Sequence, residues 1–154
     1  MSKKDLANNL TVTQLLDPAN LTATANSNGL DLQFDNGAMI IVYCGESGDT
    51  LSSTVKWDYI LQDSSDNSTF TAVTDNNRVT YGTVNTSTGV FATVDAASED
   101  DAAYKIGYVG PERYVRVAVT KTGTHTNGTP HGVVGISNPI HKPDSGGSDG
   151  TSTG

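Results

Sequence analysis

The spacing of apolar residues restricts the fold of this chain more than any other feature of its sequence. Val115, Val117 and Val119 occupy every second position of the segment 113–121. This period of two places the three valines on one face of a β-strand, because successive side chains of a strand point to opposite faces. No segment has a sustained apolar stripe with the 3.6-residue period of a helix. The sequence therefore predicts strands, with little or no helix.

The segment around the single tryptophan alternates in the same way. Three large side chains are expected to face the interior of the protein, with Trp57 largely buried: Trp57, Tyr59 and Leu61. The polar residues of the same strand are expected to face outward: Lys56, Asp58 and Gln62.

The region before this strand predicts two further strands. Residues 29–34 alternate, with Phe34 on the apolar face. Asn36 and Gly37 are expected to form a tight turn, because both residues tolerate positive φ. Residues 38–44 form a short, continuous apolar run, which is typical of a strand buried on both faces.

Other short strands are expected at 21–25, 69–73, 81–84, 89–94, 104–109 and 131–137. Residues 98–101 have the acidic composition that favours the start of a single helical turn. In total, about eight to ten short strands are separated by Gly, Asn, Asp and Ser turns. The sequence predicts an all-β protein of one domain, an antiparallel β-sandwich or barrel.

The two ends of the chain differ from its middle. Residues 142–154 contain no apolar side chain and are expected to form a flexible tail. Residues 1–12 are expected to form an N-terminal arm, which leaves residues 13–141 as the β-sandwich domain. The arm contains three apolar residues that a free polar segment does not explain: Leu6, Leu10 and Val12. We expect these residues to contact a neighbouring subunit or another partner.

Charge and composition exclude several classes of function. The chain has 17 acidic and 9 basic residues and a net charge of −8, which disfavours binding to nucleic acid. No apolar run approaches the about 20 residues of a membrane helix. The N-terminus lacks the apolar core of a secretory signal, which indicates synthesis in the cytoplasm. Cys44 is the only cysteine and is expected to be a small buried apolar residue.

Residues capable of chemistry are present but match no catalytic or metal-binding motif. His131 and His141 flank a predicted strand, but neither they nor His125 have the spacing of a zinc site. Residues 63–68 lack the Gly and Glu of a calcium loop, so a solvated turn is favoured. The acidic cluster at 99–101 is not a separated glycosidase pair. The sequence predicts no catalytic residue, no metal and no cofactor.

Several segments resemble, in their order and composition, one family of phage proteins. These are the GESGDTL loop at 45–51 and the segments 61–73, 104–108, 113–117 and 123–130. Their succession resembles the head decoration, or cement, proteins that tailed bacteriophages encode beside the major capsid protein.

The resemblance implies a jelly-roll-like β-sandwich and a function without catalysis. It implies that the protein stabilises the outer surface of a virion capsid by bridging major capsid protein subunits. It also implies a homo-oligomer, either a dimer or a trimer. The family has no shared catalytic motif, so no active residue is transferred to this chain.

The sequence leaves two other functions open. The first is a carbohydrate- or host-surface-binding module of a phage head or tail fibre, in which Trp57 and Tyr59 would form an exposed stacking platform. The second is a small glycan-processing enzyme, which the missing carboxylate pair disfavours. Burial of Trp57 and Phe70 would argue for the decoration protein.

Overall fold

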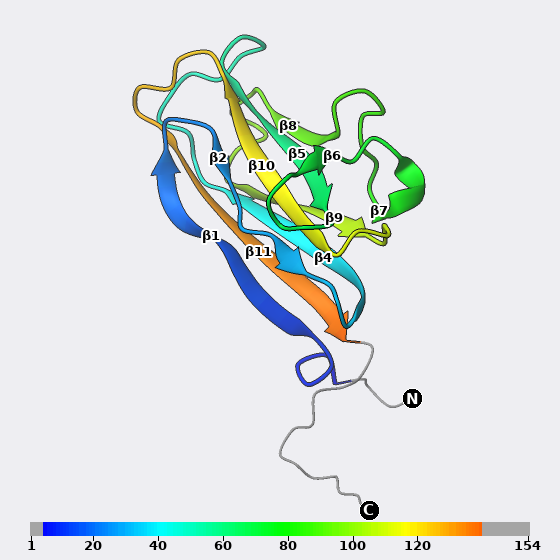
Figure 1. Cartoon of the computed structure of the whole chain (residues 1–154). Coiled ribbons are helices and arrows are strands. Elements are labelled where there is room, and N and C mark those ends of the chain that lie inside the picture. The colour runs from blue at the N-terminus through cyan, green and yellow to red at the C-terminus, as the bar shows by residue number, and fades with distance from the viewer. Residues whose placement is uncertain (1–4, 140–154) are drawn as a thin grey trace, which may run out of the picture.

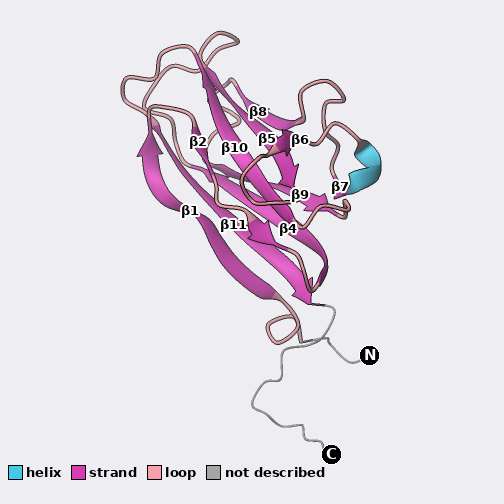
Figure 2. Ribbon diagram, in the orientation of Figure 1, coloured by secondary structure: helices cyan, strands magenta, loops and turns pink. Residues whose placement is uncertain are grey.

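The computed structural model of the protein describes residues 5–139. Its regular structure in this range consists of eleven strands and one short 3-10 helix, as Figures 1 and 2 show. The strands are β1 (Thr11–Leu21), β2 (Ala25–Asn26), β3 (Leu30–Asp31), β4 (Asp35–Cys44), β5 (Lys56–Ser64), β6 (Thr71–Ala72), β7 (Val79–Tyr81), β8 (Val90–Val94), β9 (Ala102–Tyr108), β10 (Tyr114–Thr122) and β11 (Thr129–Pro139). The 3-10 helix η1 (Asn76–Arg78) precedes β7. The predicted all-β class is confirmed.

The strands form two antiparallel sheets. Sheet A has the order β1-β11-β4-β9-β7. Sheet B has the order β2-β10-β5-β6, with β3 also paired to β10 and β8 also paired to β5. Because the short pairs β2/β3 and β6/β8 each occupy one edge, sheet B has β10 and β5 as its two long central strands (Figure 1).

The order of the strands is that of a jelly roll. The chain passes from sheet A to sheet B after β1, returns for β4, and crosses again to β5. After β8 it alternates between the sheets, so that β11 finally lies between β1 and β4. This double Greek-key arrangement places the first and last long strands side by side, and it confirms the jelly-roll-like sandwich.

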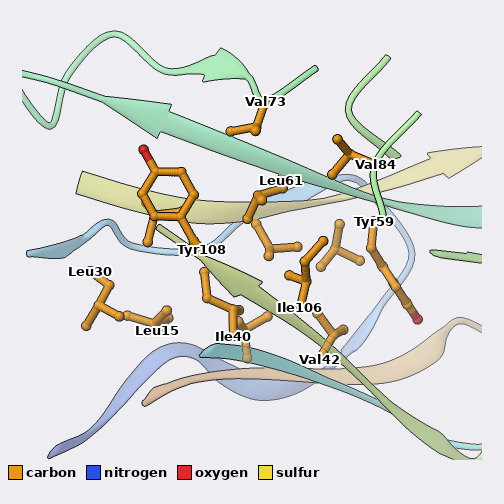
Figure 3. Close-up of a cluster of buried hydrophobic side chains, with 14 of the residues drawn as sticks. Leu15, Leu30, Ile40, Val42, Tyr59, Leu61, Val73, Val84, Ile106 and Tyr108 are labelled. Carbon is orange, nitrogen blue, oxygen red and sulfur yellow. The ribbon is translucent and has the colours of Figure 1, made fainter. Parts of the chain in front are cut away.

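The core lies between the two sheets and contains the side chains that the alternation predicts. Trp57, Tyr59 and Leu61 are fully buried on β5, and the three valines of β10 are fully buried opposite sheet A. Sheet A contributes Ile40, Val42 and other apolar residues to the same cluster, part of which is drawn in Figure 3. The outward positions of β5 are polar apart from Ile60. The predicted faces of both strands are therefore confirmed.

The structure corrects the expected turn before β4. Asn36 and Gly37 lie inside β4, between the paired residues Asp35 and Ala38, and the turn lies earlier, where the Asp35 amide donates to the Leu32 carbonyl at 3.1 Å. Strand β3 is only two residues long, and Phe34 is 66% exposed rather than on the apolar face. The pairing of Asp35 with Pro139 of β11 extends β4 across the local Asn-Gly turn signal.

Other local expectations are also wrong in position. The first long strand is Thr11–Leu21, not 21–25, so the sheet begins inside the expected arm. Residues 98–101 form a turn and not a helix. The run 38–44 is buried on one face only, because Ile40, Val42 and Cys44 are buried while the intervening residues are partly or largely exposed. In the described part of the chain, no helix is long and apolar enough to cross a membrane.

Candidate binding surface

The outer face of sheet A is apolar along β4 and the neighbouring part of β11. On β4 the outward residues are Met39, Ile41 and Tyr43. Strand register places Ile136 beside Met39 and Val134 beside Ile41 on β11. We call this set of five residues the sheet-A face. It explains why the run 38–44 has no polar residue although only one of its faces is in the core.

The sheet-A face has one charged neighbour among the outward positions that pair with residues 39–43. On β9 these positions are Ala103, Lys105 and Gly107. The Lys105 ammonium lies 4.4 Å from the centre of the Tyr81 ring, which is a cation–π geometry. No acidic side chain occupies these rows, although the whole chain has a net charge of −8.

A hollow lies at each end of the sheet-A face. The first hollow has a volume of about 560 Å³ and is lined by Tyr43, Pro18 and Pro130, with Gly132 and Ala103 as its small neighbours. It forms because the strands on either side of Tyr43 carry a glycine and an alanine at the paired positions.

The second hollow lies at the Met39 end and has a volume of about 290 Å³. Its wall includes Leu10, Met39, Val109 and Ile136. Gly37 also lines this hollow, and a side chain at that position would approach Val109 to 3.2 Å. The lack of a side chain at Gly37 therefore keeps the second hollow open.

Exposed apolar side chains also gather at the end of the sandwich where β1 begins and β11 ends. Four of them are between 44% and 67% exposed: Leu6, Val12, Phe34 and Val109. Leu10 is half-buried and joins this group through the second hollow. We call these five residues the apolar end. Figure 1 shows that β1 starts, β4 starts and β11 finishes at this same end of the molecule.

The three residues expected from sequence to contact a partner all lie in the apolar end. Leu6 and Leu10 precede β1, and Val12 lies in β1, where it pairs with Ile136. The structure places Leu10 and Val109 in the wall of the second hollow, with Phe34 at the same end of the sandwich, and sequence reasoning selected neither Phe34 nor Val109. Val109 follows a strand and precedes Gly110-Pro111, so its exposure becomes evident only from the register of β9 against β4.

The outer face of sheet B is polar by contrast. Lys56 forms an ion pair with Asp58 at 3.2 Å, and the Arg116 Nε donates to the Gln62 side-chain oxygen at 2.8 Å. The Arg116 guanidinium also covers the ring of Phe70 at 4.0 Å, so Phe70 is partly and not fully buried. The two faces of the sandwich therefore differ in character, and the apolar one belongs to sheet A.

A buried polar network closes the end of the core opposite the apolar end. His131 is 2% exposed; its Nε2 lies 2.9 Å from the Tyr59 hydroxyl and its Nδ1 lies 3.0 Å from the Thr129 carbonyl. The carbonyl accepts only, so Nδ1 donates to it and Nε2 accepts from Tyr59. The Trp57 Nε1 donates to the Thr129 hydroxyl at 3.0 Å. Burial lowers the pKa of His131 to about 4, and burial raises the pKa of Tyr59.

His125 packs on the other side of the tryptophan ring. Its ring centre lies 4.5 Å from that of Trp57, and its Nε2 lies 3.1 Å from the Thr122 carbonyl. Its Nδ1 lies 3.8 Å from a carboxylate oxygen of Asp49, and that carboxylate accepts backbone amides of the 126–128 turn. These amides hold the pKa of Asp49 below its usual value. This network is enclosed in the protein, and its Asp49 carboxylate holds the 126–128 turn in place.

A second buried network lies at the other end of the core. Asp63 accepts hydrogen bonds from the Tyr108 hydroxyl and from Arg78, both at 2.7 Å. Burial and this bond raise the pKa of Tyr108. Tyr59 and Tyr108 lie at opposite ends of the buried cluster in Figure 3. Tyr59 therefore belongs to the network of His131, and Tyr108 belongs to the network of Asp63.

The other residues considered as metal or acid sites have structural partners. Asp66 accepts the backbone amides of Ser68 and Thr69, so its carboxylate closes the 63–68 turn. Asp100 accepts the amide of Ser47. In the part of the chain that the structure describes, no group of three metal-ligating side chains is suitably placed. His141, the other histidine beside the predicted strand, lies outside the described residues.

Cys44 is buried, as the sequence predicts. It lies at the end of β4, where its backbone pairs with that of His131. Burial raises the pKa of its thiol, which keeps the sulfur in its unreactive neutral form.

The chain matches no model of a known protein family, and no curated protein is similar to it in sequence. Among solved structures it is similar to the crystal structure of the SPBc2 prophage-derived protein YomS, with 13% sequence identity and a TM-score of 0.46. The similarity covers 83% of this chain and 91% of that chain. Similarity at this level carries no argument about function, which has to be derived from the surfaces described above.

Proposed function

We propose that this protein is a non-enzymatic structural component of a bacteriophage particle. It binds the outer surface of the capsid and stabilises it by bridging major capsid protein subunits. The observation that carries the proposal is the apolar end, where apolar side chains from three separate segments lie at the same end of the sandwich. Together with the family resemblance of the sequence, this surface fits a module that docks onto an assembled shell.

The apolar end is suited to binding a protein surface. Contiguous exposed apolar residues are uncommon on soluble proteins and mark interaction sites. Leu6 and Leu10 lie in the segment before β1, whereas Phe34 and Val109 lie in turns of the rigid sandwich. A surface of this composition combines a short arm with a fixed platform. A partner that covers both parts would remove their apolar area from water, which stabilises the complex.

The buried aromatics disfavour the carbohydrate-binding alternative. Trp57 and Tyr59 are fully buried, so they form no stacking platform. The exposed aromatics Phe34, Tyr43 and Tyr81 lie on three different elements. The decoration function remains the one that the surfaces support best.

Removing the apolar end is expected to weaken binding to capsids. Deletion of residues 1–9 combined with Phe34→Asp removes two exposed apolar side chains and adds a charge where contact is proposed. We expect at least about a tenfold loss of affinity, because a few central apolar residues carry most of the binding energy of an interface. Co-sedimentation with capsids purified without the protein measures the loss.

The matched control is Thr122→Asp, which adds the same charge to the polar outer face of sheet B at an exposed position opposite Lys56. It is expected to bind as the unmodified protein does. Equal capsid occupancy for the deletion variant and the control would contradict the assignment of the apolar end.

Particles that lack the protein are expected to assemble but to release DNA at lower temperature or under milder osmotic shock. A module that touches several subunits gains an avidity of about 10²–10⁴-fold over a single contact and resists separation of the subunits it joins. A fluorescent dye that reports released DNA during heating measures the difference, and adding back purified protein is expected to abolish it. Unchanged thermal release, together with binding of the free protein to a host polysaccharide, would instead support the adhesion module.

A further inference from the structure

We propose that the first hollow is a docking pocket for an arginine side chain on the surface of a neighbouring capsid protein subunit. The inference deepens the proposed function and rests on it for the identity of the partner. A protein that bridges subunits needs at least two contacts, and the apolar end supplies one of them. The first hollow lies at the other end of β4, roughly 30 Å away if each of the ten residues of the strand adds about 3.3 Å.

The walls of the first hollow suit the stem and the plane of an arginine side chain. Tyr43, Pro18 and Pro130 line it. Tyr43 is 49% exposed, because its partners on the two neighbouring strands are Gly132 and Ala103. An uncovered tyrosine ring attracts a guanidinium through a cation–π contact, and apolar walls pack against the methylene groups of a long basic side chain.

One charged group lies in the wall of the first hollow. Of the described residues that line it, only Asp101 carries a charge at neutral pH. His131 and Cys44 also line it, but burial lowers the pKa of His131 to about 4 and raises the pKa of the Cys44 thiol, so both side chains are neutral. Asp101 is exposed, and no basic side chain within residues 5–139 forms an ion pair with it. Its carboxylate is therefore available to a cation from a partner.

The surroundings of the hollow also favour a cation. Glu46 and Asp17 are exposed, and each adjoins a lining residue in the sequence. Lys105 lies on the outer face of β9, but its ammonium lies over the ring of Tyr81 on β7, on the side of β9 away from β4. The whole chain has a net charge of −8. A partner that presents a positive charge is therefore attracted to this end of sheet A, whereas an acidic partner is repelled.

Arginine fits the hollow better than lysine does. Tyr43 and Asp101 both line it, so an aromatic ring and a carboxylate are offered to the same ligand. A guanidinium is planar and stacks on an aromatic ring, and it forms two parallel hydrogen bonds with a carboxylate. The ammonium of lysine is a compact, strongly hydrated charge that gains less from an apolar wall.

NMR titration of the full chain with three short capped peptides tests the proposal without a capsid. The peptides differ only in their central residue, which is arginine, lysine or leucine. The arginine peptide is expected to shift the amide signals of Ala103 and Gly132 and to bind at least about fivefold more tightly than the leucine peptide, with the lysine peptide between them. Added salt is expected to weaken its binding. Equal affinity of the arginine peptide and either other peptide would overturn the proposal, and so would the absence of shifts around the hollow.

Two variants assign the binding to the hollow. The backbone φ of Asp101 is 50°, a left-handed conformation that asparagine also adopts, so Asp101→Asn removes the charge without straining the turn. Asp101→Asn and Tyr43→Ala are each expected to lower the affinity for the arginine peptide about two- to fivefold. Glu112→Gln is the matched control, because it removes the same charge from the turn between β9 and β10 at the opposite end of the sandwich. Circular dichroism establishes the fold of each variant, and equal affinity of Asp101→Asn and Glu112→Gln would overturn the proposal.

Co-sedimentation with capsids separates this inference from the proposed function. The double variant Tyr43→Ala, Asp101→Asn is expected to bind capsids at least about fivefold more weakly than the unmodified protein. Unchanged capsid binding by the folded double variant would overturn the arginine contact and leave the proposed function in place. An unmodified protein that binds the arginine peptide but no capsid would overturn the proposed function and the identity of the partner.

Discussion

Replacing Trp57 with alanine is expected to lower the free energy of unfolding by about 3–5 kcal/mol, through lost burial and the cavity that remains. The indole is fully buried and packs between the rings of His125 and His131, with centre distances of 4.5 and 4.7 Å. The substitution also removes the donor to the Thr129 hydroxyl. Denaturant titration of the two proteins measures the difference.

Two further variants separate the contributions. Trp57→Phe keeps most of the apolar volume and removes the N–H, so we expect a smaller loss, of about 1–3 kcal/mol. Lys56→Ala changes the neighbouring outward residue, whose ion pair with Asp58 is partly exposed, and is expected to cost less than about 1 kcal/mol. Equal losses for Trp57→Ala and Lys56→Ala would show that the indole does not hold the core together.

The long central strands could be predicted from sequence because burial on one face imposes a period of two. The three valines of β10 and the Trp57, Tyr59 and Leu61 series of β5 face sheet A, so their alternation is a direct record of the fold. These strands are the middle of sheet B, where packing and not local turn chemistry decides the conformation.

The segments that were placed wrongly are those in which local and tertiary preferences disagree. Strand β1 has no regular alternation in its sequence, because it contains Pro18 and its register with β11 is irregular at two points. Its proline is tolerated because β1 is the edge of sheet A. Asn36 and Gly37 have the composition of a turn, but their strand pairs on both sides through most of its length.

The candidate surfaces needed the structure for a different reason. The composition of residues 38–44 shows that β4 is apolar on both faces, but not that one of these faces is uncovered. Leu6, Leu10 and Val12 were noticed because they interrupt a polar segment. Their neighbours Phe34 and Val109 come from distant turns, and only the fold brings them to the same end.

The buried histidine network is the clearest case of a feature without a local signal. His131 and Tyr59 are 72 residues apart and meet through a hydrogen bond of 2.9 Å inside the core. In the sequence, His131 lies in a Gly- and Thr-rich region that is typical of an exposed turn. Its burial has a measurable consequence for the stability of the protein in acid.

Lowering the pH from about 7 to about 4 is expected to reduce the free energy of unfolding by about 3 kcal/mol through His131. Burial lowers the pKa of this histidine from 6.5 to about 4 in the folded protein. In the unfolded chain the pKa is about 6.5, and each unit of difference corresponds to about 1.4 kcal/mol. Between these two values the unfolded state binds a proton that the folded state excludes, so stability is complete above pH about 6.5 and falls as the pH falls.

The surroundings of His131 explain why the folded state excludes this proton. Its Nε2 accepts from the Tyr59 hydroxyl, and the rings of Tyr59 and Trp57 pack against it. His125 lies on the far side of Trp57, and any positive charge on it further lowers the pKa of His131. Asp49 lies beside His125, and within residues 5–139 no carboxylate forms an ion pair or a hydrogen bond with His131 that would stabilise its protonated form.

The carboxyl groups with lowered pKa values change stability in a lower pH range than His131 does. Hydrogen bonds hold the pKa values of Asp31, Asp49 and Asp66 below the ordinary 3.8. These groups contribute stability above about pH 4, and that contribution is lost as the pH falls through their folded pKa values. Among the groups with shifted pKa values, it is therefore His131 that changes stability between pH 6.5 and 4.

Denaturant titrations at a series of pH values between 7.5 and 4.5 test this prediction in the unmodified protein and in His131→Gln. The variant has a lower stability at neutral pH, because glutamine does not reproduce both hydrogen bonds of the ring, but its stability is expected to change little with pH in this interval. An NMR titration of the unmodified protein is expected to give a His131 pKa of about 4. An equally steep loss of stability in His131→Gln, or a His131 pKa near 6.5, would show that the ring is not held in its neutral form by burial.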